Sequence, residues 1–547
     1  MNGLMMDYPL TIQHIYQRAI TYFGRRDIAT LTDEGMHRYT YADFGQRVRQ
    51  LSAALRTAGV QDGDRIGTFG WNTYRHLELY FAIPCMGAVL HTLNIRLFAD
   101  QLIYIINNAE DSIIFVDGDL VPLLEGVADQ LPTVRRYVIM GPPAPQSQGK
   151  LQPAVDYEEF LASAPDDFTW PQLDERQACA MCYTSGTTGN PKGVVYSHRS
   201  AYLHTLAITA ADAVALSWND TVLPIVPMFH ANAWGLPYAA TLVGARQIFP
   251  GRFMDPAVIA RLIQDERVTC AAGVPTIWIN LLQVLSRQSF DLSSLSRILC
   301  GGSAVPRSLA EALDKYHLRI VHAWGMTETS PLATLCNLQP EMRDWPYEKQ
   351  LEQRSRQGIA VPGVDLRIVD PDTNQVLPWD GKSFGEIQVR GPWVASAYYK
   401  SPESAPRFAD GWFRTGDVAT VDEYGYIQIV DRTKDLVKSG GEWISSVELE
   451  NLIMAHPKVL EAAVIAVPHE KWQERPLACV VPKPEFVGQI TEQEILDFLR
   501  PQVARWWLPD AVVFIDAIPK TSVGKFDKKV LRQQFTQMPA HATTPTR

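Results

Sequence analysis

The amino-acid sequence predicts an α/β protein with a large N-terminal domain and a small α+β C-terminal domain. Up to about residue 330, short apolar strands alternate with helices, a rhythm typical of doubly wound, mainly parallel sheets covered by helices on both faces. From about 360 to 430, short strands alternate with turns, which indicates a small antiparallel β unit. A chain of 547 residues is too long for one core. We therefore expect domains at 1–433 and 434–547.

The first elements are recognised by caps and apolar spacing. A helix is expected from Thr11 to Phe23, and Thr40 with Asp43 forms a capping box for a helix that ends at Gly59. Strands follow at 64–70, 112–116 and 136–140, with helices from about 73, from about 99 and over 121–131. After a surface loop at 141–150, a strand at 178–183 enters a glycine- and hydroxyl-rich segment, and a helix is expected from about 197.

The later elements place polar turns at strand ends. Strands are expected at 221–226, 269–272, 297–300 and 319–322, and helices at 257–266, at 275–285 and from 306. The last two strands run into Gly301-Gly302-Ser303 and into Trp324–Thr329. Open α/β sheets bind ligands at the carboxyl ends of their strands. The C-terminal domain is expected to have helices at 447–454 and 492–503, strands at 462–467, 478–481 and 512–515, and a frayed tail from 538.

Composition excludes several classes of protein. The net charge of -10 argues against nucleic acid as the main partner, because surfaces that bind phosphate backbones are basic. The first ten residues lack the pattern of a signal peptide, and the most apolar window, at 80–93, is too short to cross a bilayer. We expect a soluble cytoplasmic protein. Cys179 and Cys182 lie in an apolar strand without a second pair, so buried thiols are favoured over a metal or redox site.

The segment from Tyr183 to Gly193 has the chemistry of a polyphosphate cradle. Glycines let backbone N–H groups turn inward and form a nest for anions, while hydroxyls add donors and a lysine adds positive charge. The spacing is not that of a Walker A loop. The residues assigned to this cradle are Thr184, Ser185, Gly186, Thr187, Thr188, Gly189 and Lys192.

Four further stretches are rich in polar residues, although each is weak by itself. Trp324–Thr329 offers a ring for a base and a carboxylate for Mg²⁺. Gly411–Asp417 offers an acid for ribose hydroxyls, and a lysine on the turn at 519–529 can reach into a cleft. The fourth stretch runs from 425 to 444. Capped turns, hairpins and a solvated basic loop are the structural alternatives.

Together and in this order, these motifs resemble the adenylate-forming enzymes, which include acyl-CoA synthetases, luciferases and the adenylation domains of peptide synthetases. The resemblance runs from about 11 to 529, and the segment from Asp431 to 446 is most similar to bacterial medium- and long-chain fatty acyl-CoA synthetases. It implies that an acid attacks the α-phosphorus of ATP with Mg²⁺ present, which gives acyl-AMP and pyrophosphate. The thiol of CoA then displaces AMP.

The resemblance also implies roles for individual residues. Glu328 and Thr184 should hold Mg²⁺, Trp324 should lie against adenine, and Asp417 should bind ribose. Lys525 should contact the acyl carboxylate and the α-phosphate, and Lys434 should be the hinge of a mobile C-terminal domain. The adenylate site should further include Gly302, His322, Ala323, Thr327, Arg432, Lys438 and Trp443, and the CoA path should include Gly440 and Gly441. His322 and Ala323 depart from the Gln or Asn and the Gly expected there.

The acyl pocket is expected along Pro227–Pro237, with His230 and Trp234 in its wall. This stretch contains no Asp or Glu, which disfavours a substrate with an amine. The resemblance implies a medium- to long-chain fatty acid as the substrate. An aryl- or short-chain acid, a carrier protein as acceptor, and a non-catalytic adenylate sensor stay open as alternatives. An amphipathic substrate leaves peripheral membrane contact open, and the family is often dimeric.

Overall fold

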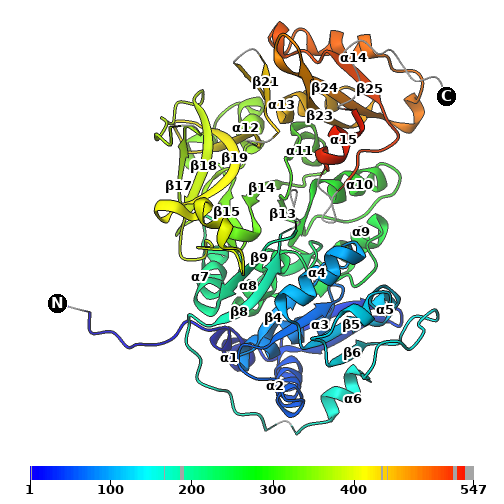
Figure 1. Ribbon diagram of the computed structural model, residues 1–547, viewed down its shortest axis with the longest axis vertical. Coiled ribbons are helices and arrows are strands. Elements are labelled where there is room, and N and C mark those ends of the chain that lie inside the picture. Colours follow the sequence, from blue (N-terminus) through cyan, green and yellow to red (C-terminus); the bar gives the residue numbers. More distant parts are fainter. Residues whose placement is uncertain are drawn as a thin grey trace.

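The computed structural model describes residues 1, 3–165, 167–184, 190–371, 373–432, 435–439, 442–520 and 526–535, without the side chains of 438, 442 and 443. The chain forms a large N-terminal part with an antiparallel sheet at its side, and a C-terminal domain at one end of the long axis (Figure 1). Helices cover the sheets of the N-terminal part, as the alternating pattern predicted. Among the described residues, no helix is long and apolar enough to cross a membrane.

One sheet of the N-terminal part has seven strands in the order β7-β6-β5-β3-β4-β8-β9. Neighbours pair in parallel except β8 and β9, which are antiparallel. The strands are β3 (Arg65–Phe69), β4 (Val89–Thr92), β5 (Ile113–Asp117), β6 (Arg136–Met140), β7 (Ala154–Asp156), β8 (Ala178–Tyr183) and β9 (Gly193–Ser197). The helices in this stretch are α2 (Tyr41–Thr57), α3 (Tyr74–Cys85), α4 (Ala99–Ala109), α5 (Val121–Glu125) and α6 (Tyr157–Ala162).

The second sheet has nine strands in the order β16-β15-β14-β13-β12-β10-β11-β1-β2. They are β1 (Asp27–Thr32), β2 (Gly35–Thr40), β10 (Thr221–Pro224), β11 (Arg246–Phe249), β12 (Cys270–Gly273), β13 (Arg297–Cys300), β14 (Ile320–Gly325), β15 (Leu332–Leu335) and β16 (Ile359–Ala360). The associated helices are α1 (Ile12–Tyr22), α7 (His198–Thr209), α8 (Leu236–Val243), α9 (Pro256–Asp265), α10 (Pro275–Leu285), α11 (Arg307–Asp314) and α12 (Tyr347–Arg354). Thr40 and Asp43 form the predicted capping box at the start of α2.

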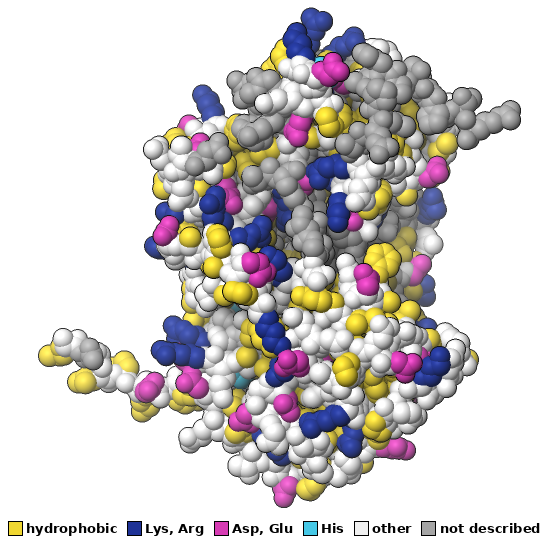
Figure 2. Space-filling view, in the orientation of Figure 1, with side chains coloured by type: hydrophobic (Ala, Val, Ile, Leu, Met, Phe, Trp, Pro, Cys, Tyr) yellow, Lys and Arg dark blue, Asp and Glu magenta, His cyan; other side chains and the backbone are white. Residues whose placement is uncertain are grey.

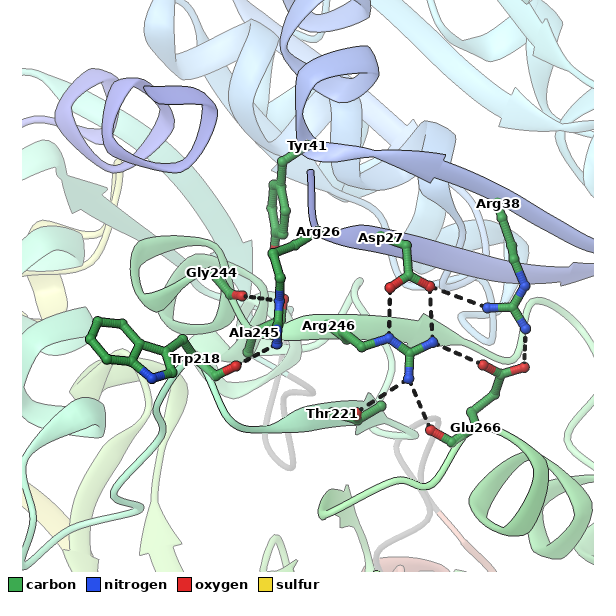
Figure 3. Close-up of polar contacts among 10 residues, drawn as sticks. All are labelled: Arg26, Asp27, Arg38, Tyr41, Trp218, Thr221, Gly244, Ala245, Arg246 and Glu266. Carbon is green, nitrogen blue, oxygen red and sulfur yellow. Dashed lines mark hydrogen bonds and ion pairs between the residues drawn. The ribbon is translucent and has the colours of Figure 1, made fainter. Parts of the chain in front are cut away.

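The hairpin β1–β2 extends this sheet at its edge and was not predicted from the sequence. β1 pairs in parallel with β11, more than two hundred residues further along the chain. Arg246 on β11 binds Asp27 through Nε–Oδ1 (2.6 Å) and Nη2–Oδ2 (2.9 Å), and also contacts Glu266 at 3.2 Å (Figure 3). Arg38 on β2 contacts the same two carboxylates. The guanidinium of Arg246 lowers the pKa of Asp27, so this network is charged at neutral pH.

The predicted β unit is a four-stranded antiparallel sheet, β17 (Asp365–Val369), β18 (Phe384–Arg390), β19 (Phe413–Val421) and β20 (Ile427–Arg432). The C-terminal domain contains β21 (Val437–Ser439), β22 (Glu442–Ile444), β23 (Val459–His469), β24 (Gln473–Pro482) and β25 (Ala511–Phe514), with helices α13 (Ser446–Met454), α14 (Glu492–Leu499) and α15 (Lys528–Phe535). This domain has separate hydrophobic clusters on the two faces of its sheet. On the face drawn in Figure 2, basic and acidic side chains are interspersed.

Hydrogen bonds cross from β20 to the C-terminal domain. The hydroxyl of Ser445 donates to the carbonyl of Val430, and the Ser446 N–H donates to Asp431 Oδ2 at 2.8 Å. Burial raises the pKa of Asp431. These contacts join the two domains in the orientation described here.

All seven cysteines are buried and free of disulfides, as predicted for apolar thiols. Cys179 and Cys182 lie on β8, and burial raises the pKa of Cys182 to about 11. Neither thiol therefore carries the charge that redox chemistry requires.

Candidate active site

A cavity of about 400 Å³ lies where the two large sheets meet the β unit, whose strand β20 contributes Arg432. It brings together most of those predicted site residues whose side chains the structure describes. Its wall includes Thr184, Lys192, His230, Trp234, Gly302, Ala323, Trp324, Thr327, Glu328 and Arg432. A second cavity of about 280 Å³ between the domains shares Gly302, Ala323, Trp324 and Arg432 with the first, and adds Asp417 and His322.

The described ends of the polyphosphate segment adjoin two paired antiparallel strands, β8 and β9. The helix expected from about 197 is confirmed as α7, which begins at His198, whereas strand β9 before it was not predicted. The Thr184 N–H donates to the Lys192 carbonyl (2.9 Å), and the Lys192 N–H donates to Thr184 Oγ1 (3.1 Å), which joins the ends of the two strands. The antiparallel pairing explains why Thr184 and Lys192, eight residues apart, line the same cavity.

Two cationic groups face this end of the cavity. Lys192 Nζ donates to Ser404 Oγ at 3.0 Å and lies 5.0 Å above the ring of Tyr398. Arg407 Nη1 reaches the Tyr398 hydroxyl at 3.4 Å and also lines the cavity. Sequence reasoning found Lys192 but missed Tyr398 and Arg407. The one available signal for Arg407 was its position shortly before the stretch that ends at Asp417.

Glu328 lies on a short 3-10 helix, η4 (Thr327–Thr329), directly after β14. Its carboxylate accepts a hydrogen bond from the Tyr398 hydroxyl, and its side chain and backbone are 4 % exposed. The Tyr196 hydroxyl donates to the Thr327 carbonyl at 2.7 Å, which fixes the turn. Oxygen donors from one carboxylate and one hydroxyl suit Mg²⁺, which binds few protein groups when phosphates supply further oxygens. Among the described residues, no cluster of three or more His, Cys, Asp or Glu could hold a metal alone.

Asp417 joins two other predicted residues. Its Oδ2 accepts the Trp324 Nε1–H at 2.9 Å, and its Oδ1 lies 2.9 Å from Arg432 Nε. The carboxylate of Asp417 raises the pKa of Arg432. The strand predicted to end at His322 continues as β14 to Gly325, so Trp324 stands on a strand instead of a turn. This strand holds the indole edge against the carboxylate.

His322 is buried behind the site and is 1 % exposed. Its Nδ1 lies 3.1 Å from the Ser355 carbonyl. Burial lowers its pKa to about 4, so the imidazole is neutral at pH 7. A neutral ring cannot supply positive charge to a phosphate, so His322 differs in its role from the cations Lys192 and Arg407.

The predicted acyl wall forms a left-handed turn. Ala231, Asn232, Ala233 and Trp234 have φ values of 42°, 52°, 48° and 58°. Each non-glycine residue in this region costs about 1–2 kcal/mol, so the surroundings must hold the turn. One such contact is the Cys182 thiol, which lies 3.1 Å from Asn232 Oδ1. Strain of this kind concentrates at functional sites. The left-handed turn places Trp234 in the cavity wall.

Several predicted residues lie outside the described residues, and the structure therefore does not test them. They are Ser185, Gly186, Thr187, Thr188, Gly189, Lys434, Gly440, Gly441 and Lys525, together with the side chains of Lys438 and Trp443. Phe526, the residue that follows Lys525, lines the cavity between the domains.

The chain belongs to the family of AMP-binding enzymes. The model of the AMP-binding enzyme matches residues 18–399, and that of the AMP-binding enzyme C-terminal domain matches residues 448–525. The fold is thus that of an adenylate-forming ligase.

Individual relatives sharpen this class. A long-chain-fatty-acid–CoA ligase of Thermus thermophilus is 48% identical over 97% of this chain and 96% of its own. A 3-methylmercaptopropionyl-CoA ligase of Ruegeria pomeroyi is 46% identical over 98% and 99%. A medium-chain-fatty-acid–CoA ligase of Ectopseudomonas oleovorans is 42% identical over 98% of each chain. Among solved structures, ATP-bound MatB from Rhodopseudomonas palustris superposes with a TM-score of 0.82 at 28% identity, over 96% of this chain and 99% of that one. The chain is an acid–thiol ligase of the AMP-forming type.

Proposed function

We propose that this protein is an ATP-dependent CoA ligase for medium- to long-chain fatty acids. One observation carries the proposal: a single cavity has polar residues at one end and an apolar wall at the other. Thr184, Lys192 and Glu328 stand at the polar end, whereas Ile208, Val214, Leu236, Leu299, Leu332 and Leu335 form the apolar wall. Adenylation requires a carboxylate beside the α-phosphate of ATP, and this wall offers its chain a place away from water.

The polar groups fit the charge that the first step concentrates. A carboxylate must approach a polyanion, so cations and N–H donors have to offset the repulsion between them. Lys192 and Arg407 supply positive charge, and Asp417 is oriented by Trp324 and Arg432 to accept ribose hydroxyls. Mg²⁺, when bound by Glu328 and Thr184, would neutralise phosphate charge. We assign Lys525 to the carboxylate and α-phosphate.

The apolar end favours an unbranched aliphatic chain. Among the described residues that line the 400 Å³ cavity, Glu328 is the one carboxylate, and it stands at the polar end. A substrate ammonium group would therefore lack a partner in the apolar wall. Each methylene of a chain buried there gains about 0.8 kcal/mol. The 3-methylmercaptopropionyl-CoA ligase among the relatives keeps a short thioether acid as the second candidate substrate.

The thioester step is assigned to a second orientation of the C-terminal domain. Asp431 and Ser446 are hydrogen-bonded across the boundary, and Lys434 stands between Arg432 and Asp435 in the linking segment. A rotation there would break these contacts and let the segment with Gly440 and Gly441 approach the site, since a hinge needs only a few residues. Lys438 and Trp443 would then meet the adenylate or the acyl entrance.

The decisive experiment is a pyrophosphate-release assay with octanoate, palmitate, 3-methylmercaptopropionate, benzoate and acetate, each with and without CoA. We expect release with octanoate and palmitate and a CoA thioester when CoA is added. A preference for 3-methylmercaptopropionate, benzoate or acetate would replace the fatty acid as substrate. Release without any CoA thioester would indicate a carrier protein as acceptor, and no release with any acid would indicate a non-catalytic adenylate sensor.

A cytoplasmic location, peripheral membrane contact and a homodimer remain predictions. Light scattering on a size-exclusion column tests the homodimer. Flotation with vesicles of neutral and anionic lipid tests the membrane contact.

A further inference from the structure

A third cavity, of about 820 Å³, lies end to end with the active-site cavity along one face of β13 and β14. Alternate residues of a strand share a face. On β13 these are Arg297 and Leu299, and Gly301 directly after the strand continues the series. Arg297 lines the third cavity, Gly301 lines the active site, and Leu299 lines both. Val214 lines both cavities as well. From Gly301 to Arg297 the strand spans about 13 Å.

The neighbouring strand repeats the same order. β13 and β14 pair in parallel, with Leu299 opposite Val321. Arg319 and Val321 line the third cavity, and Ala323 lines the active site. Both strands therefore lead from a polar end near the adenylate residues, past an apolar middle, to an arginine at the far end.

The far end carries more positive charge than its carboxylates offset. Four arginines line it, Arg297, Arg319, Arg343 and Arg354, with one carboxylate, Asp212. Arg297 pairs with Asp220, and Arg354 binds Asp314 through two hydrogen bonds of 2.7 and 2.8 Å.

The other two arginines lack such partners. Within the described part of the chain, no carboxylate lies within 4.0 Å of the Arg319 or Arg343 guanidinium. Arg354 is 8 % exposed, and its buried Nε–H has no hydrogen-bond partner there. Partial desolvation and the charge of Arg354 lower the pKa of Arg319. Such a cluster is complementary to a carboxylate.

We propose that the third cavity is the outer part of the acyl site and binds the second carboxylate of a long α,ω-dicarboxylic acid. This inference rests on the proposed acid–CoA ligase function and extends its substrate class. One carboxylate lies at the adenylate end and is activated. The chain passes between Leu299 and Val214, and the other carboxylate stays ionised beside Arg319 and Arg343. A simple fatty acid of equal length would place its methyl end among these arginines.

The proposal predicts a preference that reverses with chain length. A short diacid would leave an ionised carboxylate in the apolar middle beside Leu299, which is strongly unfavourable. A long diacid would reach the arginines. We therefore expect hexanoate to be used better than hexanedioate, and hexadecanedioate to be used at least as well as hexadecanoate, as measured by kcat/KM for pyrophosphate release.

The role of the positive charge is tested with the double variant Arg319→Gln/Arg343→Gln. Glutamine removes the charge of these two exposed side chains and keeps them polar. We expect kcat/KM for hexadecanedioate to fall about tenfold or more, as for lost charge-assisted hydrogen bonds, and octanoate to be unaffected. Arg287→Gln is the matched control, because this exposed arginine lines none of the three cavities. Leu299→Trp, which narrows the connection, should impair hexadecanedioate more than octanoate.

Several results would overturn the proposal. One is an equal loss of kcat/KM for hexadecanedioate and hexadecanoate in the double variant. Another is a ratio of kcat/KM between each diacid and the monocarboxylic acid of equal length that is the same at every chain length. If inorganic phosphate changes octanoate activation in the wild type but not in the double variant, without any diacid preference, the cavity is a site for free anions instead. Failure with every acid, hexadecanedioate included, would instead refute the ligase function itself.

Discussion

The two ends of the active-site cavity are built by different means. At the nucleotide end, side chains hold one another: Trp324 and Arg432 both bind Asp417, and Tyr398 binds Glu328. At the acyl end, the backbone conformation determines the shape of the site. Four non-glycine residues from Ala231 to Trp234 adopt positive φ and hold an apolar wall in place. Polar networks demand particular residue types, whereas apolar walls demand shape. The first end should therefore be sensitive to single atoms, and the second to volume.

The largest effect is expected at the nucleotide end from Lys525→Ala. Loss of one donor to a developing charge typically costs a hundred- to a thousandfold in rate, so acid-dependent pyrophosphate release should fall by about that factor. Thioester formation from supplied acyl-AMP should be unchanged. The control is Lys471→Ala on the exposed surface of the same domain. Equal loss in both half-reactions would contradict the role of Lys525 in adenylation alone.

The next effect tests the Asp417 network. Asp417→Asn keeps an acceptor for the Trp324 indole but removes the charge beside Arg432. We expect the KM for ATP to rise roughly ten- to a hundredfold, in line with about 1.5–3 kcal/mol for a charged hydrogen bond. Asp365→Asn is the control, since its exposed pair with Arg390 on the same sheet should contribute little. An unchanged KM would show that ribose is bound elsewhere.

His322 gives a smaller effect, on stability and its pH dependence. Its pKa of about 4 in the folded state lies below the unfolded value of about 6.5. The unfolded state thus takes up a proton first, and stability falls as pH decreases from about 6.5 towards 4. Between pH 7 and 5 this one group should cost about 2 kcal/mol. His322→Gln should lose less stability than the wild type over that range in urea unfolding, and identical losses would contradict a buried neutral imidazole.

The smallest effect is expected at the acyl end. Trp234→Leu enlarges the apolar wall, and each further buried methylene is worth about 0.8 kcal/mol, or roughly fourfold in kcat/KM. The chain-length optimum should therefore move to longer acids, while the KM for ATP stays as in the wild type. A rise in the KM for ATP without a shift in chain length would show that Trp234 serves the nucleotide end instead.

Sequence patterns predicted the regular elements well where apolar spacing and caps agreed. β6, α10 and β13 have the expected bounds, and the cavity collects Thr184, Glu328 and Trp324 as expected. Short elements were missed when long-range pairing decided them. The hairpin β1–β2 is stabilised by the pairing of β1 with β11, and β9 is stabilised by its pairing with β8.

The missed site residues have the same cause. Tyr398 and Arg407 belong to no motif, and only the fold brings them beside Lys192. The left-handed turn from Ala231 to Trp234 contains no glycine that could signal positive φ. The packing around it decides its backbone, and no local propensity reports that packing.

The position of β1–β2 at the sheet edge has a consequence for synthesis on the ribosome. β1 pairs with β11, which ends at Phe249, so the N-terminal hairpin emerges long before its partner strand exists. At about 5–20 residues per second, roughly two hundred intervening residues take about 10–40 s to translate. During that interval the hairpin edge and the carboxylate of Asp27 have no native partner on β11. A nascent chain of this protein thus presents its first strands to chaperones or to neighbouring chains well before the sheet can close over them.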